Sequence, residues 1–150
     1  ILCLRSNSRM RMPANKRTDA YLDVVEQAGL SALVREVEFV KPDDEKSAVV
    51  AKILDENPDI DGIFAGDDTM AAICLNVMKQ RGLSAPDDIK VVGADGARRT
   101  MTFMPDLTTV RQDIDRIGEL AAQSIIALIN GEKPESNIKL PVELIEGKTA

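Results

Sequence analysis

Histidine and tryptophan are absent from the 150-residue chain, and aromatic residues make up only 3% of it. A chain without histidine offers neither Ser-His-Asp nor Cys-His catalysis, and it has no imidazole ligands for zinc, copper or iron. The shortage of aromatic side chains also removes the stacking platforms on which single-strand nucleic-acid binders depend. A functional site in this chain must therefore be built mainly from other polar and charged side chains.

Positive charge is also in short supply. Lys and Arg number 19 against 25 Asp and Glu, so the formal net charge is −6. Affinity for a phosphate backbone comes from clustered Lys and Arg, so this chain is not expected to bind DNA by itself. With 44% hydrophobic and 29% charged residues, the composition is that of an ordinary globular domain that can bury a core.

Cysteine is rare, and both cysteines, Cys3 and Cys74, lie in apolar runs. We expect them to be small buried side chains in a reducing compartment, the cytoplasm; a long-range disulfide is the alternative. No run of about 18 apolar residues occurs, so no membrane-spanning segment is expected. No signal peptide is visible, and from the lack of an initiator methionine we expect a fragment or a processed chain.

Apolar residues recur in alternating strand-like and helix-like patterns along the chain. Residues 94–106 read as a long polar connection. Strand and helix patterns that alternate predict an α/β fold with a doubly wound parallel sheet and right-handed crossovers. Strands are expected at 1–4, 34–40, 60–65, 89–93, 108–111 and 138–145, and helices at 14–28, 43–57, 69–81 and 113–130.

Ligands of such sheets bind beyond the carboxyl ends of the strands. The loop after the first strand carries five cations, Arg5, Arg9, Arg11, Lys16 and Arg17. Most are expected to be solvated, with one arginine facing the cleft. A guanidinium can fork two hydrogen bonds onto vicinal hydroxyls, a carboxylate or a phosphate.

The two later strand ends carry carboxylates, Asp67 and Asp68 after one and Asp95 after the next. Asp68 is predicted to cap the following helix. Asp67 is then expected to face polar groups or a ligand, and Asp95 is either a turn residue or a cleft residue. Three carboxylates could also hold Mg²⁺, as in a phosphohydrolase. That enzyme would need an aspartate at the end of the first strand, which reads Leu4-Arg5-Ser6, and no P-loop or GxGxxG is present. No catalytic residue, metal or cofactor is therefore expected.

A series of motifs identifies a known family. They are Arg17-Thr18-Asp19-Ala20-Tyr21, Asp67-Asp68-Thr69-Met70-Ala71, Gly82-Leu83, Pro86-Asp87-Asp88-Ile89, Val91-Val92-Gly93-Ala94-Asp95 and Pro105-Asp106-Leu107-Thr108-Thr109-Val110-Arg111-Gln112. In order and spacing they resemble the effector-binding domain of LacI/GalR (lactose-repressor-like) transcriptional regulators. The tail LPVELIEGKTA is similar to that family's terminal stretch, so the likeness covers nearly the whole chain.

The resemblance implies a periplasmic-binding-protein-like fold of two lobes that bind an effector between them. Residues 1–150 would be mainly the C-terminal lobe, and 113–131 a crossover helix belonging to the first lobe. The family's DNA-binding head has no counterpart in this chain. Carried over by position, the ligand-binding residues would be Arg17, Asp67, Asp95 and Gln112, with Asp67 in place of the family's asparagine.

These observations predict a non-catalytic, ligand-sensing domain of a cytoplasmic sugar-responsive repressor. The effector would be a sugar or sugar phosphate, and the Asp95-Gly96 variant of the motif points to a ribose or sucrose type. Operator DNA would be bound only through a missing N-terminal domain. The helix at 69–81 is apolar on more than one face, and Ala72, Asn76 and Lys79 would meet a second copy in a homodimer. The alternatives are a periplasmic-type sugar-binding transport protein and the Mg²⁺-dependent phosphohydrolase.

Overall fold

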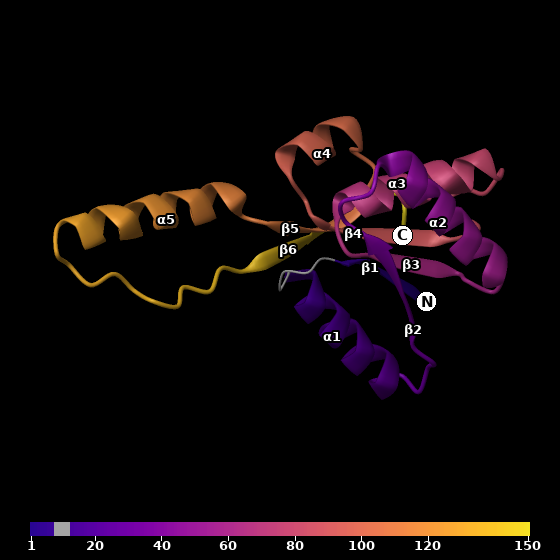
Figure 1. Ribbon diagram of the computed structural model, residues 1–150, viewed down its shortest axis with the longest axis horizontal. Helices are drawn as coiled ribbons and strands as arrows, with labels where there is room; N and C mark the ends of the chain where they lie inside the picture. Colours follow the sequence, from indigo (N-terminus) through magenta and orange to yellow (C-terminus); the bar gives the residue numbers. More distant parts are fainter. Residues whose placement is uncertain (8–12) are drawn as a thin grey trace.

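The computed structural model describes residues 1–7 and 13–150 and shows in them a single sheet with helices on both faces (Figure 1). The strands are β1 (Leu2–Asn7), β2 (Leu33–Glu38), β3 (Gly62–Ala65), β4 (Lys90–Asp95), β5 (Thr108–Gln112) and β6 (Val142–Ile145). The helices are α1 (Pro13–Gln27), α2 (Asp43–Glu56), α3 (Asp68–Gln80), α4 (Arg98–Phe103) and α5 (Ile114–Ile129). The strand order is β2-β1-β3-β4-β5-β6.

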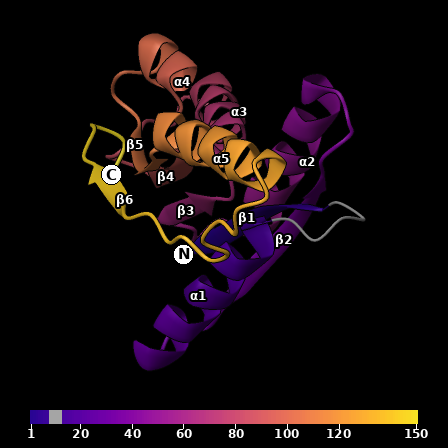
Figure 2. The same ribbon diagram turned by 90° about the vertical axis from the view of Figure 1, so that its left-hand side faces the viewer.

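The sheet is parallel from β2 to β5, and β6 joins its edge antiparallel to β5. The predicted doubly wound α/β fold is therefore confirmed. Helix α1 covers one face, whereas α2, α3 and α4 lie on the other (Figures 1 and 2). From β1 the chain moves outward to β2 and then returns past β1 to β3. The switch of direction thus lies between β1 and β3, where sheets of this kind open a crevice at their carboxyl ends.

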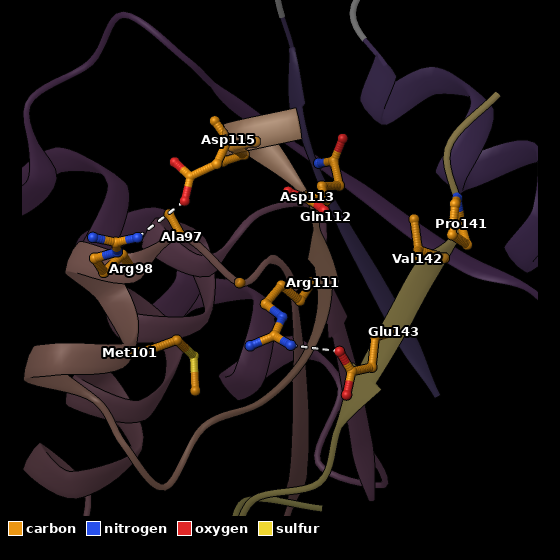
Figure 3. Close-up of a pocket in the computed structure, with 12 residues that line it drawn as sticks. Ala97, Arg98, Met101, Arg111, Gln112, Asp113, Asp115, Pro141, Val142 and Glu143 are labelled. Atoms are coloured by element: carbon orange, nitrogen blue, oxygen red, sulfur yellow. Dashed lines mark hydrogen bonds and ion pairs between the residues drawn. The ribbon is translucent and has the colours of Figure 1, made fainter. Parts of the chain in front are cut away.

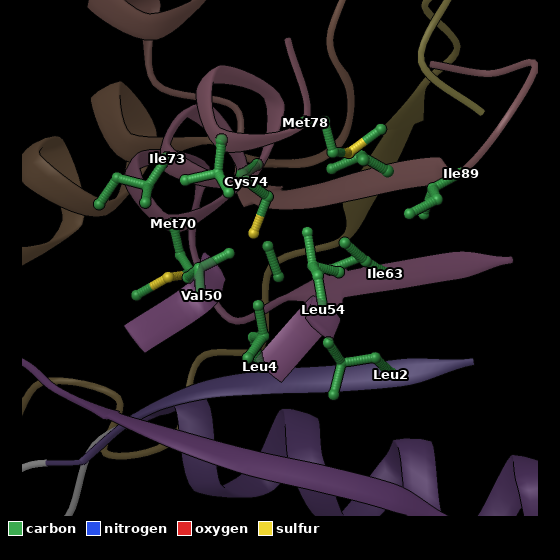
Figure 4. Packing of buried hydrophobic residues seen from close by; sticks show 14 of the residues in the cluster. Leu2, Leu4, Val50, Leu54, Ile63, Met70, Ile73, Cys74, Met78 and Ile89 are labelled. Carbon is green, nitrogen blue, oxygen red and sulfur yellow. The ribbon is translucent and has the colours of Figure 1, made fainter. Parts of the chain in front are cut away.

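The core follows from the alternation of side chains along β1. Leu2 and Leu4 point into the larger cluster, between the sheet and α2 and α3, and each is 0% exposed (Figure 4). Cys3 points to the opposite face, where Tyr21 and Val25 of α1 cover it. Burying an aliphatic side chain of this size contributes about 1.5–3 kcal/mol. The buried runs therefore anchor the sheet whose ends carry the polar residues discussed below.

Both cysteines are free and buried. Cys74 lies in the larger cluster, and burial raises the pKa of its thiol to about 12. Cys3 lies on the α1 face, so the sheet separates the two side chains. The prediction of small buried side chains is confirmed, and the disulfide alternative is wrong.

The segment expected to be a polar connection contains a helix, α4, so that prediction is wrong. The helix has only six residues and no buried side chain. It therefore lacks the apolar stripe through which a helix shows itself in a sequence. The other expected elements occur within a few residues of their predicted positions.

Helix α5 has an unusual position, because it projects away from the end of the sheet where β5 and β6 meet it (Figure 1). None of its residues is buried, and Ile125, Ile126, Leu128 and Ile129 are all more than half exposed. In the described part of the chain, no helix is both long and apolar enough to cross a membrane.

Candidate functional site

Polar side chains gather at the carboxyl ends of β1, β3 and β4, next to the point between β1 and β3 where the winding of the sheet changes direction. They border a cavity of about 420 Å³. Its lining comes from the ends of these strands, from α1 and α3, from the residue after β2 and from α2: Ser6, Arg17, Phe39, Lys46, Gly66, Asp67, Thr69, Met70, Ile73 and Asp95. Arg9 and Arg11 of the predicted basic loop lie outside the described residues.

Three of the four predicted ligand-binding residues form one hydrogen-bonded group. The Arg17 guanidinium donates to Asp95 Oδ1 at 2.6 Å, and Gln112 Nε2 donates to the same oxygen at 2.8 Å. A second guanidinium nitrogen of Arg17 donates to the carbonyl of Gly66. Side chains from α1, β4 and β5 are thus held in fixed positions, with donors and an acceptor at the mouth of the crevice.

Asp67, the fourth predicted residue, lines the same cavity but has a structural task as well. Its Oδ1 accepts the backbone N–H of Met70 at 2.8 Å, so Asp67 is the N-cap of α3. Its Oδ2 accepts from the Ser6 hydroxyl at 3.2 Å. The prediction that Asp68 caps this helix is wrong. Because a carboxylate oxygen has more than one acceptor position, Asp67 can still accept a ligand hydroxyl.

Asp68 instead points into the protein, with 3% of its surface exposed. It accepts a hydrogen bond from the Thr109 hydroxyl at 2.5 Å and another from the Gly96 amide at 2.8 Å. Burial raises the pKa of its carboxyl above the usual value, and the two hydrogen bonds act in the opposite direction. The cap was assigned wrongly because either of two adjacent acids can begin a helix. Only their places relative to β4 and β5 distinguish them.

The turn after β4 has a strained backbone at the residue that faces the crevice. Asp95 has φ of +122°, and Gly96, which follows it, has φ of +59°. A non-glycine residue in such a conformation costs on the order of 1–3 kcal/mol and persists only where its surroundings hold it. The contacts of Asp95 with Arg17 and Gln112, and of Gly96 with Asp68, are those surroundings.

Sequence reasoning missed Phe39 and Lys46, which also line the cavity. Lys46 Nζ lies 5.9 Å from the centre of the Phe39 ring and 3.3 Å from Asp43 Oδ1. Both residues follow β2, whose carboxyl end lies at the same edge of the sheet. Their position after a strand that ends at this edge is the signal from which the sequence could have predicted them as site residues.

A larger cavity, about 690 Å³, lies on the other side of the turn after β4 (Figure 3). It is bordered by the start of α4, the β5–α5 junction and the start of β6. Its main charges pair with one another, Arg98 with Asp115 at 3.0 Å and Arg111 with Glu143 at 2.5 Å (Figure 3). Since Gln112 lines this cavity and Asp95 the smaller one, the hydrogen-bonded group lies between them.

The carboxylates do not converge as a magnesium site would require. The Asp68 carboxylate is engaged with Thr109 and Gly96, while Asp67 caps α3. In residues 1–7 and 13–150, no three His, Cys, Asp or Glu side chains are grouped so that they could hold a metal ion. The arrangement is suited to hydrogen bonding of a small polar molecule.

The sequence profile of the periplasmic binding protein-like domain matches residues 1–150, and the chain belongs to this family. Among curated relatives, the ribose operon repressor of Halalkalibacterium halodurans is 32% identical over 139 residues, which are 91% of this chain and 41% of that protein. The sucrose operon repressor of Pediococcus pentosaceus is 33% identical over 140 residues, 92% of this chain and 43% of that protein.

A solved structure gives the same result. The LacI family transcriptional regulator from Arthrobacter sp. FB24, in complex with lactose, superposes with a TM-score of 0.81 at 26% identity, over 99% of this chain and 55% of that one. The chain is thus a LacI/GalR effector-binding domain, as its motifs predict. It spans about two fifths of the length of the two curated relatives.

Proposed function

We propose that this chain is the ligand-sensing part of a sugar-responsive bacterial transcriptional repressor in the cytoplasm, and that it is not an enzyme. The observation that carries the proposal is the group formed by Arg17, Asp95 and Gln112 beside the crevice. It presents both donors and acceptors, as a polyhydroxylated ligand requires, since each hydroxyl donates and accepts. The relatives that repress ribose and sucrose operons make such sugars the first candidates.

The effector would lie between this lobe and a second one. We assign α5 to that second lobe, because its apolar residues are uncovered in this chain. Ligand contacts on both lobes would favour one angle between them and so change the spacing of DNA-binding heads outside this chain. A ligand can shift such a balance only by its different affinity for the two states, typically about 1–3 kcal/mol.

A homodimer would give these heads their spacing. Ala72 and Asn76 of α3 border an open groove against α2, and Asn76 and Lys79 are exposed. We assign a second copy to this surface, where it would be the second partner of α3. The transport-protein alternative has the same fold but no support from the repressor relatives.

Calorimetric titration of the full-length protein with D-ribose, sucrose and D-ribose 5-phosphate tests the ligand class. For whichever ligand binds, Arg17→Ala and Asp95→Ala are each expected to reduce the binding free energy by about 2–5 kcal/mol, because each substitution leaves polar groups of the ligand unpaired. That loss corresponds to thirtyfold or more in affinity. Unchanged affinity in both variants would show that the ligand binds elsewhere.

Arg81→Ala is the matched control. Arg81 pairs with Asp55 at the C-terminal end of α3, whereas the crevice is at its N-terminal end. A helix of 13 residues separates the two ends by about 20 Å. This variant removes the same charge and is expected to leave affinity unchanged.

A further inference from the structure

One buried carboxylate joins three elements around the crevice without lining the cavity. Asp68 is the first residue of α3, and it accepts from Gly96, in the turn after β4, and from Thr109 of β5. It lies directly over Gly93 of β4, where an added Cβ would come within 2.5 Å of Asp68 Oδ1. The absence of a side chain at Gly93 is what admits the carboxylate to this position.

The turn that Asp68 holds is tightly seated. A Cβ added at Gly96 would lie 2.6 Å from the Cα of Arg111, so the turn packs closely against β5. Two consecutive residues, Asp95 and Gly96, have positive φ. The Gly96 amide would otherwise be a buried donor without a partner, and such a donor costs about 1–3 kcal/mol. Asp68 satisfies it and fixes the direction in which the turn leaves the sheet.

We propose that Asp68 is a positioning residue for effector binding: through Gly96 and Thr109 it holds the turn that directs the Asp95 carboxylate toward Arg17 and Gln112. This inference rests on the proposed function, because it assigns the turn a place in the ligand site. Asp68 itself does not touch the ligand. It sets the backbone geometry of the residue that does, which is strained and needs this support.

The same contacts would also exist if Asp68 served only the stability of the fold. The two roles differ in where the effect of a substitution appears. A residue that serves stability alone affects the turn no more than any other lost core contact does. Substitution of a positioning residue loosens the turn by more than its effect on global stability explains, and it weakens ligand binding accordingly.

Amide hydrogen exchange at Gly96, followed by NMR, measures without any ligand how firmly Asp68 holds the turn, and a ligand titration measures whether this hold reaches the ligand site. Asp68→Ala is expected to accelerate exchange at Gly96 at least tenfold beyond the change in global stability. Thr109→Val, which removes one donor but keeps the side-chain shape, should accelerate it in the same sense if Asp68→Ala does not fold. Asp68→Asn retains an oxygen for Gly96 and is expected to restore most of the protection. Val50→Ala is the control, since Val50 is fully buried in α2.

The inference is overturned if Gly96 exchange in the Asp68 and Thr109 variants follows global stability as it does in Val50→Ala. Titration with D-ribose and sucrose forms the second arm. Asp68→Ala should weaken the sugar that binds by tenfold or more, and Val50→Ala should leave it unchanged. If neither sugar binds the unsubstituted protein, the proposed ligand class fails for these sugars, and the exchange measurement still decides whether Asp68 holds the turn.

Discussion

Gly93→Ala gives the sharpest test of how this lobe is packed. The new Cβ would lie 2.5 Å from Asp68 Oδ1, 3.2 Å from Leu107 Cδ2 and 3.4 Å from Ala71 Cβ. The two carbon contacts can relax by small shifts. The carboxylate can move only by lengthening a hydrogen bond, because its oxygens are held by Thr109 and Gly96.

To restore an ordinary contact, Asp68 must move by somewhat less than 1 Å and lengthen at least one of those hydrogen bonds. Overpacking of a core costs about 1–3 kcal/mol, and loss of a hydrogen bond to a charged group about 1.5–3 kcal/mol. Since relaxation shares these costs, we expect Gly93→Ala to lower the free energy of unfolding by about 2–4 kcal/mol. Urea unfolding followed by far-UV circular dichroism measures this change.

Two further variants make the measurement decisive. Gly118→Ala is the control, because a Cβ at Gly118 of α5 meets nothing within 4 Å and alanine favours a helix by about 1 kcal/mol over glycine. In an Asp68→Ala background, Gly93→Ala should cost at least ~1 kcal/mol less than alone, since the clashing oxygen is gone. A cost below about 0.5 kcal/mol in the original background, or a cycle without coupling, would refute the packing of Asp68 over Gly93.

Three other predictions follow from the buried and charged groups. Cys3 and Cys74 should react with a thiol reagent at pH 8 only as fast as the protein unfolds, because both are buried and the pKa of Cys74 is about 12; rapid labelling under native conditions would contradict this. The folded-state pKa of Asp68 is raised above 3.8, so the folded state binds this proton more readily than the unfolded state does. The free energy of unfolding, relative to that of Asp68→Asn, should therefore rise as pH falls from the raised pKa toward 3.8. Urea titrations across this pH range measure the difference, and the opposite slope would contradict the prediction. The 150-residue chain alone should not retard operator DNA in a low-salt mobility-shift assay, given its net charge of −6; a sequence-specific shift would overturn the assignment of DNA binding to residues outside it.

The periodicity of apolar residues predicted the fold, and the polar residues at the ends of the strands indicated the site. The alternating strand and helix patterns predicted the sheet, because buried residues recur at regular intervals along the strands and along the helices that cover them. Arg17, Asp95 and Gln112, placed by the family motifs, do meet in the structure. Their meeting depends on the strand order, which brings the ends of β4 and β5 together.

Two of the failures depended on which of several neighbours a side chain meets, and the third on the lack of a periodic pattern. Asp67 and Asp68 are equivalent as helix starters, and only the space above Gly93 assigns one to the interior. Helix α4 has no buried stripe and so no periodic signal. Phe39 lies just after β2 and Lys46 lies in α2, and both reach the cavity only because the sheet places the carboxyl end of β2 at the same edge as those of β1 and β3.

The attachment of α5 has a mechanical consequence. Gln112 ends β5 and α5 begins at Ile114, so one residue separates the crevice from the helix. The chain returns through β6, which is hydrogen-bonded to β5 and tied to it by the Arg111–Glu143 ion pair. Helix α5 is therefore attached to the sheet at two points, through β5 before it and through β6 after it. A change in the direction of α5 would therefore act first on β5, the strand that carries Gln112 at its end and Thr109 near its start.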